Sequence, residues 1–169
     1  MTATRPMPHR TAAPPLYTPA ERARRDATRW TLVQGVLAPV QFVVFAISLV
    51  LVLRTLATGQ GEAAASLSVG IKTALLYTIM VTGAIWEKRV FGVYLFARPF
   101  FWEDVFSMLV LALHTAYLWA WWGRHLDTHS LMLLALAAYA AYLINATQFV
   151  LKLRAARLQA ASAPMGATA

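Results

Sequence analysis

The sequence predicts an all-α polytopic membrane protein: an antiparallel bundle of four transmembrane helices with both ends of the chain in the cytoplasm. Of its 169 residues, 59% are hydrophobic and only 13% are charged, whereas a soluble domain carries about a quarter charged residues. The apolar residues gather in four long runs, and the basic residues gather between them. Because so few polar side chains cannot cover a compact globule, an ordinary water-soluble enzyme is excluded.

Each of four apolar runs is long enough to cross the roughly 30 Å of membrane hydrocarbon, which takes about 20 helical residues. They are Thr31 to Leu53, Leu67 to Trp86, Phe100 to Trp122 and Leu131 to Leu151. Pro39 lies inside the first run, where we expect it to kink the helix. Together the runs predict a membrane domain over residues 30–158.

The orientation of the bundle follows from the fifteen lysines and arginines, because these residues are retained on the cytoplasmic side. Twelve of them precede the first run, separate the second from the third, or follow the fourth, and we place three, Arg54, Lys72 and Arg124, on the other side. The asymmetry predicts that both termini are cytoplasmic. It also accounts for the net charge of +8 without a nucleic-acid partner.

Two tails flank the membrane domain. Residues 1–29 are expected to form a cytosolic tail that is largely disordered, with a short basic helix near its end. Thr18 suits the N-cap of this helix, Pro19 its first position, and Glu21 completes a capping box. Residues 159–169 are expected to form a flexible C-terminal tail.

Carboxylates mark the cytosolic ends of the second and third runs, at Glu87, Glu103 and Asp104. Polar side chains in or beside a membrane span are energetically costly, so each one is expected to have a binding partner or a function. Glu103 and Asp104 are alternatively interfacial acids at a helix N-terminus, where the helix dipole favours negative charge. The aromatic segment Phe100 to Trp102 favours an apolar pocket in which one acid is held protonated.

Two helical rows extend from this end toward the middle of the membrane, because residues three, four, seven and eleven apart share a face. The third run carries Glu103, Ser107, Val110 and His114, and the fourth carries Asn145, Gln148 and Lys152. The rows are predicted to line one cavity. His114 lies about 16 Å along the helix from Glu103, so a ligand or water would have to connect them.

Each of these residues also has a purely structural interpretation. Asn145 and Gln148 are equally typical of hydrogen bonds between membrane helices, and His114 of an interior hydrogen-bonding residue. Lys152 and Arg98 are typical positive-inside charges. Motifs for nucleotide, zinc-protease or serine-hydrolase chemistry are absent from the sequence, as is cysteine, so we expect no protein-bound metal or other cofactor.

One long segment resembles a known family. Trp86 to Tyr117 reads WEKRVFGVYLFARPFFWEDVFSMLVLALHTAY, and Tyr142 to Arg154 reads YLINATQFVLKLR. Both resemble the 3-vinyl bacteriochlorophyllide hydratase family of bacteriochlorophyll biosynthesis, and the likeness extends over about residues 30–158. It implies a hydro-lyase that adds water to the C3 vinyl group of a (bacterio)chlorophyllide and leaves a 1-hydroxyethyl group.

Such a hydration needs an acid that protonates the terminal vinyl carbon and a base that activates water, but no redox cofactor. We favour Glu103 as the acid because its row also carries Ser107 and His114, and Asp104 or Glu87 would then handle the water. His114 is expected to ligate the substrate magnesium or to hydrogen-bond a ring carbonyl.

The remaining candidates would bind the pigment. Ser107, Trp102, Asn145 and Gln148 are expected to contact the macrocycle, and Lys152 or Arg98 to pair with its propionate. Further partners would be water, membrane lipid and, transiently, neighbouring pathway enzymes, in the inner or intracytoplasmic membrane of a photosynthetic bacterium. The alternative is a non-enzymatic four-helix module that binds or assembles pigment.

Overall fold

The computed structural model describes residues 16–161, with side chains through residue 158. Its elements are α1 (Pro19–Ala27), α2 (Arg29–Thr58), α3 (Glu62–Phe91), the 3-10 turn η1 (Arg98–Phe100), α4 (Phe101–Trp122) and α5 (Thr128–Ala161). Within residues 16–161 there is no strand. Residues 1–15 of the predicted cytosolic tail and residues 162–169 of the predicted flexible C-terminal tail lie outside the described part, whereas α5 continues through residues 159–161 of that tail.

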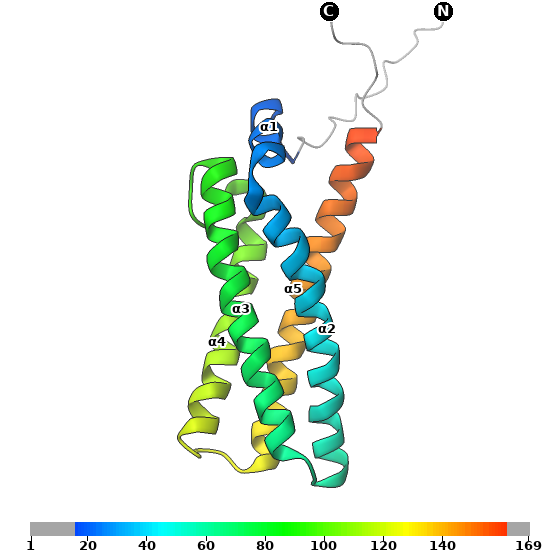
Figure 1. Ribbon diagram of the computed structural model, residues 1–169, viewed down its shortest axis with the longest axis vertical. Coiled ribbons are helices and arrows are strands. Elements are labelled where there is room, and N and C mark those ends of the chain that lie inside the picture. The colour runs from blue at the N-terminus through cyan, green and yellow to red at the C-terminus, as the bar shows by residue number, and fades with distance from the viewer. Residues whose placement is uncertain (1–15, 162–169) are drawn as a thin grey trace, which may run out of the picture.

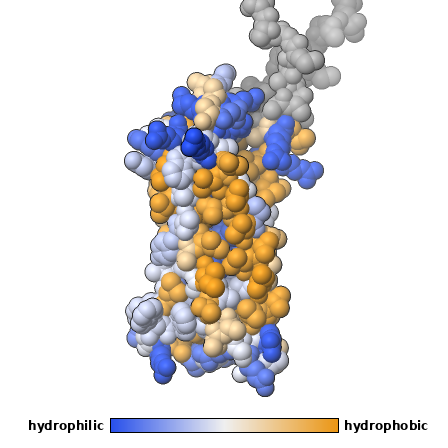
Figure 2. All heavy atoms as spheres, in the orientation of Figure 1, coloured by the Kyte–Doolittle hydropathy of each residue, from blue (hydrophilic) through white to orange (hydrophobic). Residues whose placement is uncertain are grey.

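Helices α2 to α5 run alternately up and down as a bundle (Figure 1). All four are long and apolar enough to cross a membrane, and Figure 2 shows an apolar band between two polar ends. Helices α2, α3 and α5 contain their predicted apolar runs and extend beyond them, whereas α4 begins at Phe101, one residue after the predicted start at Phe100, which ends η1. The predicted fold class, an all-α membrane protein with four spans, is therefore confirmed, whereas its orientation remains a prediction.

The bundle consists of two hairpins, α2–α3 and α4–α5, whose helices pack more extensively within each hairpin than between hairpins. The first hairpin turns through Gly59 and Gly61, with φ of 68° and 88°. Glycine adopts this left-handed region without the steric cost that a Cβ imposes. Helix α2 continues through Pro39 without interruption.

The core between the helices is apolar over most of its length, with Val52, Val69, Val110 and Tyr117 fully buried. Lys72 is also fully buried, inside α3. The charge count predicts that Lys72 lies at the outer connection between α2 and α3. That prediction is wrong, because Lys72 is buried inside α3. Without Lys72 the count becomes twelve basic residues against two, Arg54 and Arg124, which strengthens the asymmetry.

Helix α1 packs against the end of the bundle where α3 meets α4 (Figure 1). The predicted capping box is confirmed: Thr18 caps the helix and Glu21 accepts from the Thr18 backbone N–H at 2.7 Å. These hydrogen bonds lower the pKa of Glu21. Arg24 Nε donates to the Val90 carbonyl at 2.8 Å, which ties α1 to the end of α3.

An aromatic cluster fills the space beneath α1. Tyr17 stacks on Phe91, with ring centroids 5.8 Å apart, and Phe100 meets Tyr17, Trp86 and Phe149 at 5.6 to 6.4 Å. Burial in this cluster raises the pKa of the Tyr17 hydroxyl. The cluster fixes η1 and hence the start of α4, which carries two of the candidate acids.

Candidate active site

Three carboxyl groups gather at the α1 end of the bundle, and all three are buried. Glu87 comes from the last turns of α3, and Glu103 and Asp104 come from the first turn of α4. Their exposed fractions are only 4 to 5%. Buried carboxylates are costly unless they are paired or hydrogen-bonded, so the partners of each group indicate what it can do.

Glu87 and Asp104 bind the connection between α3 and α4. The Ala97 backbone N–H donates to Glu87 Oε2 at 3.1 Å, and the Phe96 backbone N–H donates to Asp104 Oδ2 at 2.7 Å. Phe96 adopts a left-handed backbone with φ of 60°, which is uncommon for a residue with a side chain. The two carboxyl groups are close enough to interact electrostatically, and neighbouring buried carboxyl groups are most stable when one of them keeps its proton.

Glu103 has a different partner. Lys152 Nζ lies 2.5 Å from Glu103 Oε2 and also donates to the Pro99 carbonyl. The Lys152 ammonium lies 5.2 Å from the centroid of the Phe100 ring. This ion pair stabilises the ionised carboxylate of Glu103, so Glu103 is suited to accept a proton rather than to donate one.

The predicted rows on α4 and α5 do face each other. Asn145 Nδ2 donates to Ser107 Oγ at 2.8 Å, and Glu103, Ser107, Val110 and His114 are all buried on one face of α4. Helical periodicity in the sequence thus predicts the inner face of α4 correctly. The Ser107–Asn145 bond is also what the interhelical interpretation of Asn145 predicts.

Three buried polar atoms in this region have no hydrogen-bond partner within the described part of the chain: His114 Nε2, Asn145 Oδ1 and Gln148 Oε1. His114 Nδ1 lies 2.8 Å from the Val110 carbonyl, which can only accept. Nδ1 therefore carries the proton in the neutral ring, and Nε2 presents a lone pair to the interior. That tautomer suits metal ligation and does not suit donation to a ring carbonyl.

The chain is similar to known proteins over most of its length. The family model "2-vinyl bacteriochlorophyllide hydratase (BCHF)" matches residues 17–155, a range that includes every candidate residue above. The chain belongs to this family. A relative from Rhodobacter capsulatus named 2-vinyl bacteriochlorophyllide hydratase is 68% identical over 151 residues, 89% of this chain and 88% of the relative. One of the same name from Cereibacter sphaeroides is 69% identical over 152 residues, 89% of this chain and 91% of the relative. No solved structure matches the chain.

Two residues predicted to bind substrate in this hydratase-family chain are exposed, unlike the buried carboxyl groups. The Trp102 side chain is 67% exposed, and Arg98 is exposed at the start of η1. Trp102 lies in the aromatic segment Phe100 to Trp102 and Arg98 lies two residues before it, so both are candidates only because they are near the acids in the sequence. Phe100 is instead the aromatic residue buried beside the Lys152–Glu103 pair.

Sequence reasoning missed a second polar group in the bundle, centred on Lys72. With the Gln41 amide oriented to satisfy its partners, its carbonyl oxygen accepts from Lys72 Nζ and from the Leu76 backbone N–H, both at 3.2 Å. Lys72 Nζ lies 3.6 Å from the centroid of the Tyr142 ring. A lysine inside a predicted span was the available signal, because such residues are rare and functional in membrane helices.

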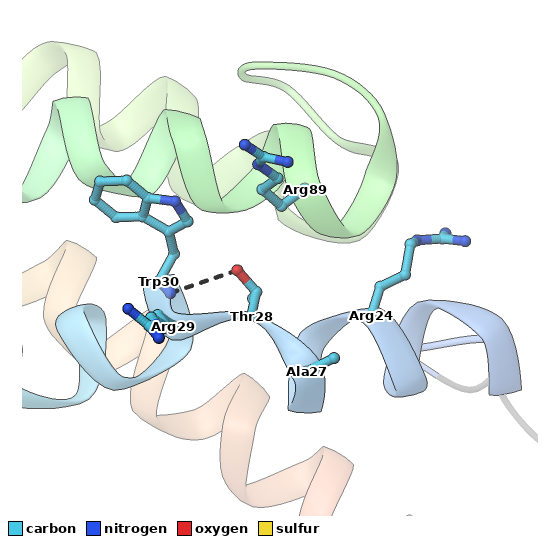
Figure 3. Close-up of a pocket in the computed structure, with 6 residues that line it drawn as sticks. All are labelled: Arg24, Ala27, Thr28, Arg29, Trp30 and Arg89. Atoms are coloured by element: carbon cyan, nitrogen blue, oxygen red, sulfur yellow. Dashed lines mark hydrogen bonds between the residues drawn. The ribbon is translucent and has the colours of Figure 1, made fainter.

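Two hollows lie on the surface of the described part of the chain. A cavity of about 390 Å³ at the junction of α1 and α2 is lined by Arg24, Ala27, Thr28, Arg29, Trp30 and Arg89 (Figure 3). Three arginines give it the chemistry of an anion site at the membrane surface. An apolar groove of about 490 Å³ follows α5 and is lined by Ala140, Leu143, Ile144, Thr147, Gln148 and Leu151, so Gln148 lies at the border between this groove and the interior.

Proposed function

We propose that the chain adds water to the vinyl group of a chlorophyllide or bacteriochlorophyllide and forms the 1-hydroxyethyl product. The observation that carries this proposal is the set of three buried carboxyl groups in a chain of the hydratase family. One group is ion-paired and the other two are neighbouring buried carboxyl groups, so the first can act as a base and the pair can act as an acid. The 2-vinyl group of the family name and the C3 vinyl group are one substituent under two numbering schemes.

The acid is the Glu87–Asp104 pair. The proton that this pair keeps is transferred to the terminal vinyl carbon, and the positive charge that forms on the inner vinyl carbon spreads into the macrocycle. The Phe96 and Ala97 N–H groups stabilise the carboxylate that remains. This assignment differs from the expectation that Glu103 is the acid, because Glu103 is ion-paired with Lys152.

The base is Glu103. Its carboxylate accepts a proton from water as the water oxygen bonds to the inner vinyl carbon, and the Lys152 ammonium fixes the carboxylate in place. The sum of the two steps is one water added across the double bond, and return of the proton from Glu103 to the Glu87–Asp104 pair restores the starting state. Proton transfer by positioned groups contributes about 10²- to 10⁴-fold to such a reaction, and neither step consumes an oxidant or a reductant.

The substrate is held along the inner faces of α4 and α5. The His114 Nε2 lone pair would ligate the magnesium of the substrate, a role that requires the tautomer set by Val110. Asn145 Oδ1 and Gln148 Oε1 accept from water or from the pigment. Ser107 orients the Asn145 amide.

The bundle would be inserted as a multi-pass protein of the inner or intracytoplasmic membrane, with the carboxyl groups at the cytosolic end. The basic residues around α1 and the α3–α4 connection support this orientation. Arg24, Arg29 and Arg89 would meet anionic lipid headgroups in the cavity of Figure 3. The same cytosolic face is where neighbouring pathway enzymes would make transient contact.

The test uses protein purified in detergent, a 3-vinyl chlorophyllide, and water enriched in heavy oxygen, under nitrogen and without added nicotinamide, flavin or iron. Absorption should show the loss of vinyl conjugation, and mass spectrometry should find the heavy label in the new hydroxyl group. An unlabelled product, or a reaction that requires added O₂, would contradict hydration. Stoichiometric pigment that copurifies but never turns over would favour the non-enzymatic pigment-binding module.

A further inference from the structure

Lys72 is a buried lysine to which the described part of the bundle offers no counter-charge. Its exposed fraction is 0%, it lies in the middle of α3, and no carboxylate among residues 16–158 pairs with it. The groups around it are the neutral Gln41 amide and the Tyr142 ring. An ionisable residue at membrane depth is expensive and is retained for a task, so an anionic partner from outside the chain is indicated.

The separation between Lys72 and the carboxyl groups can be estimated along α5. Lys72 Nζ lies against Tyr142, which is ten residues before Lys152 on α5. That separation corresponds to about 15 Å along the helix. The buried atoms without hydrogen-bond partners, His114 Nε2, Asn145 Oδ1 and Gln148 Oε1, come from the facing surfaces of α4 and α5 over the same length, so a line of unsatisfied polar groups joins the two sites.

The seam between the two hairpins contains both sites. Lys72 and Glu87 belong to α3 in the first hairpin, whereas His114 and Lys152 belong to α4 and α5 in the second. Packing is less extensive between the hairpins than within them. A flat ligand that separates the hairpins would therefore disturb the weaker interface and would meet both polar sites.

A chlorophyllide has complementary polarity. Its vinyl group lies on one edge of the macrocycle, and its keto, ester and propionate oxygens lie toward the opposite edge. Among these oxygens, only the propionate carboxylate carries a full negative charge. Lys152, the cation expected from the sequence to meet this carboxylate, is already paired with Glu103, whereas Lys72 has no such partner.

We infer that Lys72, positioned by Gln41, binds the propionate carboxylate of the substrate, so that the macrocycle lies edge-on in the seam with its vinyl group at the Glu87, Asp104 and Glu103 carboxyl groups. The inference rests on the proposed hydratase function. It identifies the propionate as the substrate group that fixes the position of the macrocycle along the bundle. An anion that neutralises a buried ammonium removes the cost of the unpaired charge. Binding would therefore discriminate strongly between the free acid and an ester.

The test compares a 3-vinyl chlorophyllide with its propionate methyl ester, which has the same macrocycle and no negative charge. Dissociation constants are measured by tryptophan fluorescence quenching of the full chain in detergent. The wild type should bind the free acid at least tenfold more tightly, since hydrogen bonds to charged groups are stronger than those between neutral groups. Lys72→Met should weaken binding of the free acid to the level of the ester and leave ester binding within a factor of two to three.

Lys88→Met is the matched control, because Lys88 is an exposed lysine on the same helix, and it should keep the wild-type preference. A wild type without any preference for the free acid overturns the inference even if Lys72→Met fails to fold. A Lys72→Met protein that retains the preference also overturns it. Turnover of both pigments by the wild type separates the two proposals: hydration without an acid preference leaves the function standing, whereas absence of hydration removes the function itself.

Discussion

At the scale of single residues, the ion pair between Glu103 and Lys152 makes Glu103 the base of the proposed reaction. Glu103→Gln keeps the hydrogen bond from Lys152 but cannot accept a proton from water. We expect kcat to fall about a hundredfold or more, with pigment affinity changed only a few-fold. The measurement is turnover at saturating pigment.

Glu62→Gln is the control for this variant, because Glu62 is exposed at the opposite end of α3. It should retain wild-type turnover. A Glu103→Gln protein with near wild-type kcat would remove Glu103 from the chemistry. A loss confined to apparent affinity would mean that Glu103 only shapes the pocket.

The proton kept by the Glu87–Asp104 pair predicts that the two residues act as one unit. Glu87→Gln and Asp104→Asn should each reduce kcat about a hundredfold or more, and the double variant should be no slower than the slower single variant. Single-turnover rate constants of the three variants show whether the effects of the two substitutions on the rate are independent. Fully multiplicative losses would show that the two carboxyl groups work independently.

His114 is predicted to recognise the substrate metal rather than to take part in proton transfer. His114→Ala removes the Nε2 lone pair, so it should weaken binding of the magnesium chlorin about tenfold or more, by analogy with the loss of other metal-site interactions. Binding of the metal-free chlorin should change little. Equal weakening for both pigments would instead indicate a packing role beside Tyr139, whose ring centroid lies 5.8 Å away.

At the scale of elements, α1 and the aromatic cluster hold the start of α4 in place. Tyr17→Ala removes a buried ring between Phe91 and Phe100, and substitutions of buried aromatic residues by alanine cost about 3 to 5 kcal/mol. We expect a lower midpoint of thermal unfolding in detergent. Tyr94→Ala, at an exposed tyrosine of the α3–α4 connection, should leave the midpoint unchanged, and equal midpoints for both variants would contradict a stabilising role for the aromatic cluster.

The elements themselves could be predicted because their determinants are local. Apolar runs of sufficient length give α2 to α5, the Thr18 and Glu21 pair gives the start of α1, and a spacing of three to four residues gives the buried face of α4. The partners of the acids could not be predicted in this way. The Lys152–Glu103 pair depends on the axial register of α5 against α4, and the N–H groups of Phe96 and Ala97 depend on the path of a loop.

At the scale of the whole molecule, the same limit explains Lys72. A lysine ten residues into a helix is compatible with a side chain that reaches the outer surface and with one that lies in the core, and only the packing of four helices distinguishes them. The structure places it in the core. The functional polar groups of this bundle therefore form two sites at different depths, the carboxyl groups at one end and Lys72 near the middle. The sequence predicts only one such site.

The orientation of the bundle is the prediction on which the cytosolic placement of the carboxyl groups depends. The chain has no cysteine, so single cysteines report position without background. Gln60→Cys, in the exposed α2–α3 turn, should react with a membrane-impermeant maleimide in intact cells, whereas Val93→Cys, in the exposed α3–α4 connection, should react only after lysis. The reason is that twelve basic residues at the Val93 end resist translocation and two lie at the Gln60 end. Labelling of Val93→Cys but not Gln60→Cys in intact cells would invert the bundle and place the carboxyl groups on the far side of the membrane.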